Sequence, residues 1–160
     1  MKNAPNFRKK AVTGFIRLFL LKKLPLAFLA GVKVKTFDEQ GTITTTRFRW
    51  INQNPFKSMY FAAMHMAAEL ATGLLLFQYM DKDTRFSMLL VETKGSFSKK
   101  AVGRITFQCQ KGREAEEFVK GILSADEGGI IQLPVVARNE NGEEVAQFQY
   151  TWSCKKKSSK

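Results

Sequence analysis

The positions of apolar residues along the chain predict a helix first and a pair of strands after it. Residues 7–30 carry apolar side chains at helical spacing with lysines and arginines between them, which is typical of a basic amphipathic helix. Such a helix either packs on the edge of the domain or attaches to a membrane surface. After it the pattern alternates with period two over 32–36 and 43–50, which predicts a β-hairpin that ends at Asn54-Pro55.

The next apolar segment, residues 59–77 after Ser58, is rich in Ala, Met and Leu and is the most helical stretch of the chain. It carries almost no charge, and a helix that is apolar all round must be buried on all sides. Glu69 is its only acid, and His65, the only histidine of the chain, lies one turn earlier on the same face. We expect Glu69 to hold this histidine in the core or at an interface.

Four further strands and one short insert follow. The strands are predicted at residues 87–97, 104–110, 130–138 and 144–152, with a hairpin turn at Asn141-Gly142 and a short helix or irregular insert at 113–125. No βαβ alternation accompanies them, so the pattern predicts an α+β domain. A buried helix followed by a run of strands is what an antiparallel sheet curled around that helix requires.

Composition indicates one compact domain with a positive surface. A chain of 160 residues that is 44% hydrophobic is large enough to bury a core. The formal net charge of +12 attracts anions, but nucleic-acid binding would rest on this charge alone, so we expect no specific nucleic acid. Much of the charge lies at the two ends, including a basic tail at 155–160, and such tails are usually solvated.

Other features argue against a metal site, export and a membrane span. Cys109 and Cys154 are too few and too far apart for a disulfide framework or a metal cluster, so we expect reduced thiols, no metal and a cytoplasmic location. Residues 15–32 do not form a transmembrane helix, because two lysines and Pro25 interrupt the run of about 20 apolar residues that a span needs. The same lysines break the apolar part of a secretory signal.

Glu69 is the candidate for acid–base chemistry. A carboxylate in an apolar helix is costly unless it borders a cleft or a partner, and burial raises its pKa toward values useful for proton transfer. The alternative is a structural glutamate that is bonded to a helix end or paired across a dimer. The first turn of the same helix leaves the backbone amides around Phe61 and Ala62 unpaired, and these can stabilise an oxyanion.

Asn54, Tyr60 and Glu69 follow one another at intervals of six and nine residues. With this spacing the central helix resembles the hotdog-fold thioesterases, in particular the phenylacetate-pathway thioesterase-like branch and a sister family of unassigned function. In that superfamily an Asn precedes a His-Gly-Gly turn by the same interval, and an acid follows the His by the same interval. Here Tyr60 replaces the His, and Phe61 and Ala62 replace the two glycines that let the backbone approach a thioester carbonyl.

The resemblance implies a hotdog fold, a long central helix wrapped by a curved antiparallel sheet, over residues 31–154, preceded by a separate helix at 1–30. It implies acyl thioesters as substrates, with coenzyme A as part of the substrate and no other cofactor. Tyr60 would donate where the family His acts, or simply pack. Asn54 would position substrate or water, or serve only as a turn residue.

A basic loop joins the third and fourth strands and contains Lys99, Lys100 and Arg104. It resembles the superfamily loop where basic groups often meet the phosphates of coenzyme A, so these three residues and His65 are expected to contact substrate. The alternative for the loop is a solvated turn.

Two hypotheses for function remain. The first is an enzyme that hydrolyses acyl-CoA or acyl-carrier thioesters with Glu69 as general base or nucleophile. The second is a non-catalytic module that binds an acyl or acyl-CoA group. In both, we expect a homodimer or a dimer of dimers, because an uncharged helix surface is a liability in a monomer.

Overall fold

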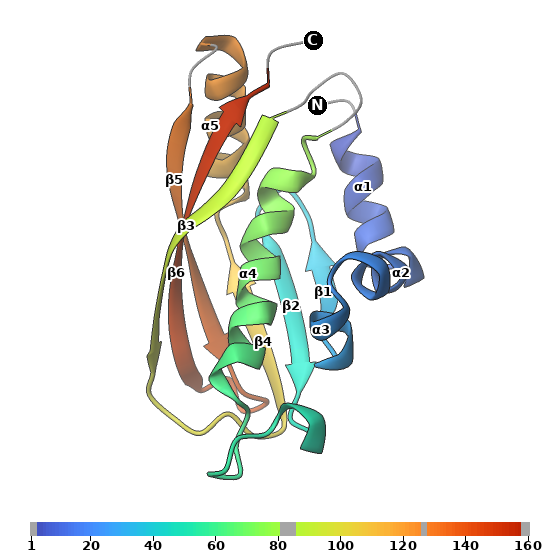
Figure 1. Cartoon of the computed structure of the whole chain (residues 1–160), viewed down its shortest axis with the longest axis vertical. Helices are drawn as coiled ribbons and strands as arrows, with labels where there is room; N and C mark the ends of the chain where they lie inside the picture. The colour runs from blue at the N-terminus through green and yellow to red at the C-terminus, as the bar shows by residue number, and fades with distance from the viewer. Residues whose placement is uncertain (1–2, 81–85, 126–127, 158–160) are drawn as a thin grey trace.

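The computed structural model of the chain describes residues 3–80, 86–125 and 128–157, and its sheet curves around one long helix (Figure 1). The strands are β1 (Lys33–Phe37), β2 (Thr42–Arg47), β3 (Phe86–Phe97), β4 (Arg104–Cys109), β5 (Gly129–Arg138) and β6 (Glu144–Lys156). They lie in the order β1-β2-β4-β5-β6-β3, and every neighbouring pair is antiparallel. The predicted α+β architecture is therefore confirmed.

The long helix α4 (Phe61–Phe77) packs mainly on β2. Small residues make this close packing possible, since Ala67, Ala68 and Ala71 are fully buried. The Thr44 hydroxyl of β2 also donates a hydrogen bond of 2.6 Å to the Ala67 carbonyl oxygen. The sheet-facing side of α4 is thus covered by the sheet of the same chain.

The opposite side of α4 is not covered. Its outward stripe consists of Ala62, Met66, Glu69, Gly73 and Phe77, none of which is buried. These residues recur at intervals of three and four, so they form one continuous face of the helix. The prediction that α4 is buried on all sides is wrong for the single chain, because the sheet covers only one side.

Three helices stand where the sequence predicted one: α1 (Ala4–Ala11), α2 (Gly14–Lys23) and α3 (Pro25–Leu29). The first break occurs at Thr13, whose hydroxyl caps α2 by accepting a hydrogen bond from the Phe15 amide. The second occurs before Pro25, which fits the first turn of a helix but disrupts a helix interior. The apolar periodicity of residues 7–30 did not reveal these two breaks. The three helices lie beside α4 and β1, on the right of the view in Figure 1.

Arg8 anchors α1 to the rest of the molecule. Its Nε donates a 2.6 Å hydrogen bond to Gln78 Oε1, and its guanidinium lies 3.3 Å from Glu39. None of the helices in the described part of the chain has the length and apolar character that crossing a bilayer requires.

Smaller differences occur at element ends. The second strand stops at Arg47 instead of residue 50, and Trp50–Asn52 forms a short 3-10 helix in which Trp50 is 82% exposed. Ser58 does not cap α4, whose N-cap is Tyr60. Alternating polar and aromatic residues imitate a strand even where the chain leaves the sheet, which is why the strand was predicted too long.

The later elements follow their prediction closely. The insert at 113–125 is the helix α5 (Gly112–Ala125), and Gly142 takes a φ of 80° in the predicted turn between β5 and β6. Strand β6 runs to Lys156, so it includes the start of the predicted basic tail. The last three residues of that tail lie outside the described residues.

Candidate functional site

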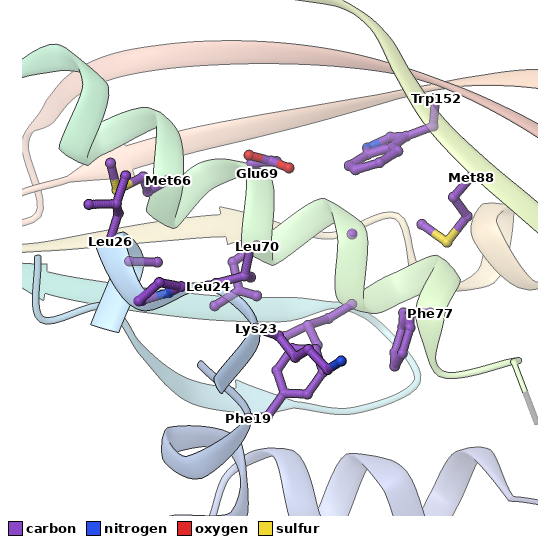
Figure 2. Close-up of a pocket in the computed structure, with 14 residues that line it drawn as sticks. Phe19, Lys23, Leu24, Leu26, Met66, Glu69, Leu70, Phe77, Met88 and Trp152 are labelled. Carbon is purple, nitrogen blue, oxygen red and sulfur yellow. The ribbon is translucent and has the colours of Figure 1, made fainter. Parts of the chain in front are cut away.

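A cavity of about 450 Å³ lies between α4 and the helices α2 and α3 (Figure 2). Its wall is formed by Phe19, Lys23, Leu24, Pro25, Leu26, Ala27, Met66, Glu69, Leu70, Gly73, Leu74, Phe77, Met88 and Trp152. All but two of these side chains are uncharged and almost all are apolar. A concave, apolar site of this size with one or two charged groups is typical of a small-molecule or acyl-chain site.

Glu69 is the acid of this cavity, and Figure 2 shows its carboxylate between Met66 and Trp152. Within the described residues, its carboxylate has no hydrogen-bond or ion-pair partner. One side of the residue is open to solvent, while its apolar neighbours exclude water from the other. This desolvation raises the pKa of Glu69 above its ordinary value. A carboxylate with these properties is poised to accept a proton.

His65 has partners other than the expected one. Its Nδ1 lies 2.9 Å from the Tyr150 hydroxyl and 3.4 Å from the Thr93 hydroxyl, and the Tyr150 hydroxyl also donates to the His65 carbonyl oxygen at 3.1 Å. The expectation that Glu69 holds His65 is therefore wrong. Burial lowers the pKa of His65, so the imidazole is neutral at pH 7.

Aromatic rings enclose His65 and fix its position. Its ring centroid lies 4.8 Å from that of Phe148 and 6.2 Å from those of Phe61 and Phe97. Gly95 on β3 leaves the remaining space, because a Cβ there would lie 3.0 Å from His65 Nε2. This packing holds the imidazole in one place, and the assignment of His65 as a substrate-binding residue stays a prediction.

The start of α4 presents free backbone donors. The Tyr60 carbonyl oxygen accepts hydrogen bonds from the amides of Ala63 and Met64, and Tyr60 has no side-chain cap bond. Within the described residues the amides of Phe61 and Ala62, the first of the helix, have no hydrogen-bond partner and are available to an acceptor, as predicted from the helix geometry. The exposed Tyr60 ring contacts the Phe61 ring, with 4.7 Å between centroids.

Asn54 shapes the turn before α4. Its side-chain oxygen accepts hydrogen bonds from the amides of Phe56 and Ser58, and its side-chain amide donates 3.0 Å to the Ser58 hydroxyl. These bonds hold the turn in which Lys57 adopts a φ of 58°. Of the two interpretations of Asn54, the turn residue is the one for which the structure supplies contacts.

The basic loop between β3 and β4 lies beside this turn. Lys100 Nζ donates 3.2 Å to the Phe56 carbonyl oxygen. Lys99 pairs with Glu143 at 2.5 Å, and Arg104 lies 3.9 Å from Glu140. Acids of the β5–β6 hairpin thus already neutralise two of the three cations, and the prediction that they bind coenzyme A phosphates remains to be tested.

The predicted site residues fall into two groups in one chain. Asn54, Tyr60 and the basic loop gather at the start of α4, whereas Glu69 lies two turns further along. Glu69 lies eight positions after Phe61, which corresponds to about 12 Å along the helix axis. One thioester carbonyl cannot therefore contact the Phe61 amide and the Glu69 carboxylate of the same chain.

Several residues of the site had no signal in the sequence. Tyr150 and Thr93 come from strands β6 and β3, and Trp152 donates a 3.0 Å hydrogen bond from Nε1 to the Thr72 hydroxyl of α4. Each lies on a strand that only the fold brings to α4. Phe19 and Leu24 were recognised as apolar helix residues, but the cavity between their helices and α4 depends on tertiary packing.

The two cysteines and the acids suggest no further chemistry. Cys109 and Cys154 are free and buried, and burial raises the pKa of Cys109 to about 12 and that of Cys154 to about 11. Three metal-ligating side chains do not come together anywhere in the ranges that the structure describes. Glu69 is consequently the titratable group best placed for chemistry.

Solved structures with the same architecture are known, all at low sequence identity. A protein of unknown function from Pseudomonas aeruginosa, described as "Probable Thioesterase", has a TM-score of 0.75 at 18% identity over 91% of this chain and 97% of its own. A protein of unknown function from Chlorobaculum tepidum gives 0.75 at 14% identity over 96% and 94%. A thioesterase from Haemophilus influenzae gives 0.67 at 12% identity over 88% of both chains. A comparison with curated proteins finds no match.

Identities this low show the fold alone, and they confirm the predicted hotdog fold. The sequence also matches a family over residues 14–154, a range that begins with α2 and ends within β6. The match therefore includes α2 and α3, which line the cavity, as well as the curved sheet. The chain belongs to the family described as "Domain of unknown function (DUF4442)".

Proposed function

We propose that the protein hydrolyses acyl thioesters with Glu69 as the general base. The observation that carries the proposal is the Glu69 carboxylate, which has a raised pKa and no ion-pair partner within the described residues and stands in the wall of an apolar cavity. The apolar wall suits the acyl chain, and the carboxylate suits the activation of water at the carbonyl. Related hotdog structures described as thioesterases support this choice of reaction.

The reaction would proceed by addition and elimination. Glu69 takes a proton from water as the water oxygen bonds to the thioester carbonyl carbon, and the negative charge forms on the carbonyl oxygen. The amides of Phe61 and Ala62 stabilise that oxyanion at the helix start. The carbon–sulfur bond then breaks, and the proton passes from Glu69 to the leaving thiolate. The products are a carboxylic acid and a free thiol, such as coenzyme A.

The site would be completed by a second copy of the chain. Because Phe61 and Glu69 lie about 12 Å apart on one helix, base and oxyanion donors can meet only across two helices. Residues 61 and 69 are equally distant from His65. Two antiparallel α4 helices related by a two-fold axis level with His65 would therefore set Glu69 of each copy opposite Phe61 of the other.

Strand β3 offers the edge along which two copies would pair. It ends the strand order, it is twelve residues long, and only Phe86 in it is buried. A long exposed edge strand is prone to pair with another chain. Thr93 contacts His65, so the same axis would cross β3 near Thr93 and set Glu92 opposite Lys94 of the other copy. The predicted homodimer would then have a specific register.

One observation favours the second candidate, a non-catalytic acyl-binding module. Phe61 and Ala62 stand where the resemblance implies two glycines, and the Phe61 ring contacts the ring of Tyr60 beside the free amides. Side chains at these positions restrict access to the amides. Such a module would keep the cavity and bind acyl groups without turnover.

Hydrolysis of a panel of acyl-CoA thioesters, short to long, distinguishes the two candidates. We expect the wild-type protein to release free thiol, at a rate that rises with pH through the raised pKa of Glu69 and then levels off. Glu69→Gln keeps the size of the side chain but removes the base, so turnover should fall by roughly 10²-fold or more. Acyl binding without thiol release by the wild-type protein would reject the enzyme and favour the module.

A further inference from the structure

The N-terminal part of the chain carries an unusual charge distribution. Residues 1–37 contain no Asp or Glu, and their cations are Lys2, Arg8, Lys9, Lys10, Arg17, Lys22, Lys23, Lys33 and Lys35. Of these, Arg8 pairs with Glu39 from outside the segment. This N-terminal segment therefore carries charge of a single sign, which favours an anionic partner.

Exposed apolar side chains lie within the same segment. The inner side of α2 packs on the core through Ile16 and Leu20, which are buried. Its outer side is also apolar. The exposed residues of this docking face are Val12, Phe15, Leu18, Leu21, Leu24, Leu26 and Leu29. A surface helix that is apolar on both sides needs a second apolar environment, because water is a poor solvent for its outer side.

The docking face borders the cavity on one side. Leu24 and Leu26 line the cavity wall and are at the same time exposed, Leu26 by 67%. Phe19 and Lys23 of α2 also line it, and Figure 2 shows these four residues along one border of the site. Whatever covers the docking face therefore lies next to the opening of the cavity.

Charge decides which occupant fits. A second copy docked through this face would set one acid-free, cationic segment against another, and like charges oppose such contact. A nucleic acid would match the charge but would leave seven apolar side chains in water. A bilayer that contains anionic lipid satisfies both features, since its headgroups meet Arg17 and Lys22 while its acyl region takes up the leucines.

We infer that α2 and α3 dock the protein on anionic lipid bilayers, with the opening of the acyl cavity turned toward the membrane. The helices lie in the plane of the interface and insert Leu18 and Leu21 below the headgroups. This inference goes beyond the proposed function. Only one part of it, the direction from which an acyl ligand enters the cavity, rests on the proposed function. Membrane docking holds whether or not Glu69 hydrolyses a thioester.

Vesicle co-sedimentation tests the docking face. We expect the full chain to bind vesicles of equal parts phosphatidylcholine and phosphatidylglycerol and to bind phosphatidylcholine vesicles much more weakly. Leu18→Gln with Leu21→Gln should lower the partition coefficient on anionic vesicles by roughly tenfold or more. Both residues are exposed and neither lines the cavity, so fold and hydrolysis of a short-chain thioester in solution should stay unchanged.

Matched controls distinguish binding through the docking face from non-specific adsorption to vesicles. Val102→Gln with Ile130→Gln removes two exposed apolar residues from the loop before β4 and from β5, outside the docking face, and should leave binding unchanged. Arg17→Gln with Lys22→Gln should weaken binding to anionic vesicles by roughly tenfold, whereas Lys120→Gln with Lys155→Gln, with the same loss of charge, should have little effect.

Three results would overturn the inference. They are a wild-type protein that ignores anionic vesicles, a leucine variant that binds like wild type, and a leucine variant that loses its dimer instead of its membrane affinity. The second result would reduce the interaction to adsorption by charge, and the third would assign the face to a second copy. Because thiol release is measured separately, failure of docking and failure of the proposed hydrolysis are distinguishable.

Discussion

The two sides of α4 differ in which side chains they leave exposed or without a partner. The side against the sheet contains Ala67, Ala68 and Ala71, which are fully buried, and the Thr44 hydroxyl is satisfied there by a backbone carbonyl. The outward stripe contains Glu69, a carboxylate without an ion-pair partner in the described part of the chain, and the exposed Phe77.

This difference separates the residues that stabilise the fold from those that are available for function. On the sheet side, the buried alanines pack closely against the strands, so substitutions there would act through stability. On the outward side, a cavity, a desolvated acid and a bare strand edge occur together. The uncovered side is therefore the one that a ligand and a second copy would complete.

After the loss of Glu69 itself, the largest effect is expected at the free amides of α4. Phe61→Pro removes the first amide donor but keeps the helix, because proline is favoured at this position and Tyr60, with φ of -65° and ψ of 136°, already has the backbone that a residue before proline requires. Loss of one oxyanion donor should lower the turnover number by roughly 10²-fold. Thiol release under saturating substrate measures it.

Phe61→Ala is the matched control for that substitution. It removes the aromatic ring and keeps the amide, so turnover should stay near the wild-type value or rise as access to the amide improves. Equal losses in the two variants would show that the ring, and not the amide, matters.

A tenfold effect is expected on the dimer from charges on β3. Lys94→Glu sets like charges against Glu92 of the other copy at two symmetric contacts, which should weaken dimerisation by roughly tenfold. The double variant Glu92→Lys with Lys94→Glu exchanges the two charges and should restore the dimer. Sedimentation equilibrium measures both, and a wild-type monomer at micromolar concentration would contradict the arrangement.

A smaller effect is expected in the basic loop. Replacing Lys99, Lys100 and Arg104 by Ala should raise KM for acyl-CoA severalfold at low salt and flatten its salt dependence, because exposed charge pairs are screened. The effect is limited since Glu143 and Glu140 already pair with two of these cations. An unchanged KM and an unchanged salt slope would leave the loop as a solvated turn.

The smallest effect is expected on stability. Burial raises the pKa of Glu69 in the folded state, so the ionised carboxylate costs stability as pH rises through that pKa. Glu69→Gln has no charge to bury and should therefore have the higher Tm at neutral pH. The difference should vanish when pH falls below the ordinary glutamate pKa. Thermal melts across pH test this, and a pH-independent difference would point to packing instead.

The sequence predicted the order of elements well because each has a strong local signal. Alternation with period two identified the first two strands, strand-like runs between turns identified the later four, and the nearly uncharged run of Ala, Met and Leu identified α4. Local signals also exposed Glu69, since an acid stands out in an apolar helix. They did not reveal the breaks at Thr13 and Pro25, because both flanking segments keep the same apolar period.

Contacts between distant elements could not be predicted from the sequence. His65 was expected beside Glu69 because the two share a helix face, but Tyr150 and Thr93 reach the imidazole from other elements. The cavity likewise depends on how α2 and α3 rest on α4, which no pattern within one segment records. The separation of Glu69 from the free amides is a different case, because it follows from the number of residues between them in one predicted helix.

Complementation between two inactive variants tests most directly whether the active site forms across two copies. Glu69→Gln and Phe61→Pro should each be nearly inactive alone. In a heterodimer, the Phe61→Pro chain supplies Glu69 and the Glu69→Gln chain supplies the Phe61 amide, so one of the two sites is intact. Mixing equal amounts through unfolding and refolding should recover about a quarter of wild-type thiol release, because half of the dimers are mixed. A mixture as inactive as its components would contradict the account.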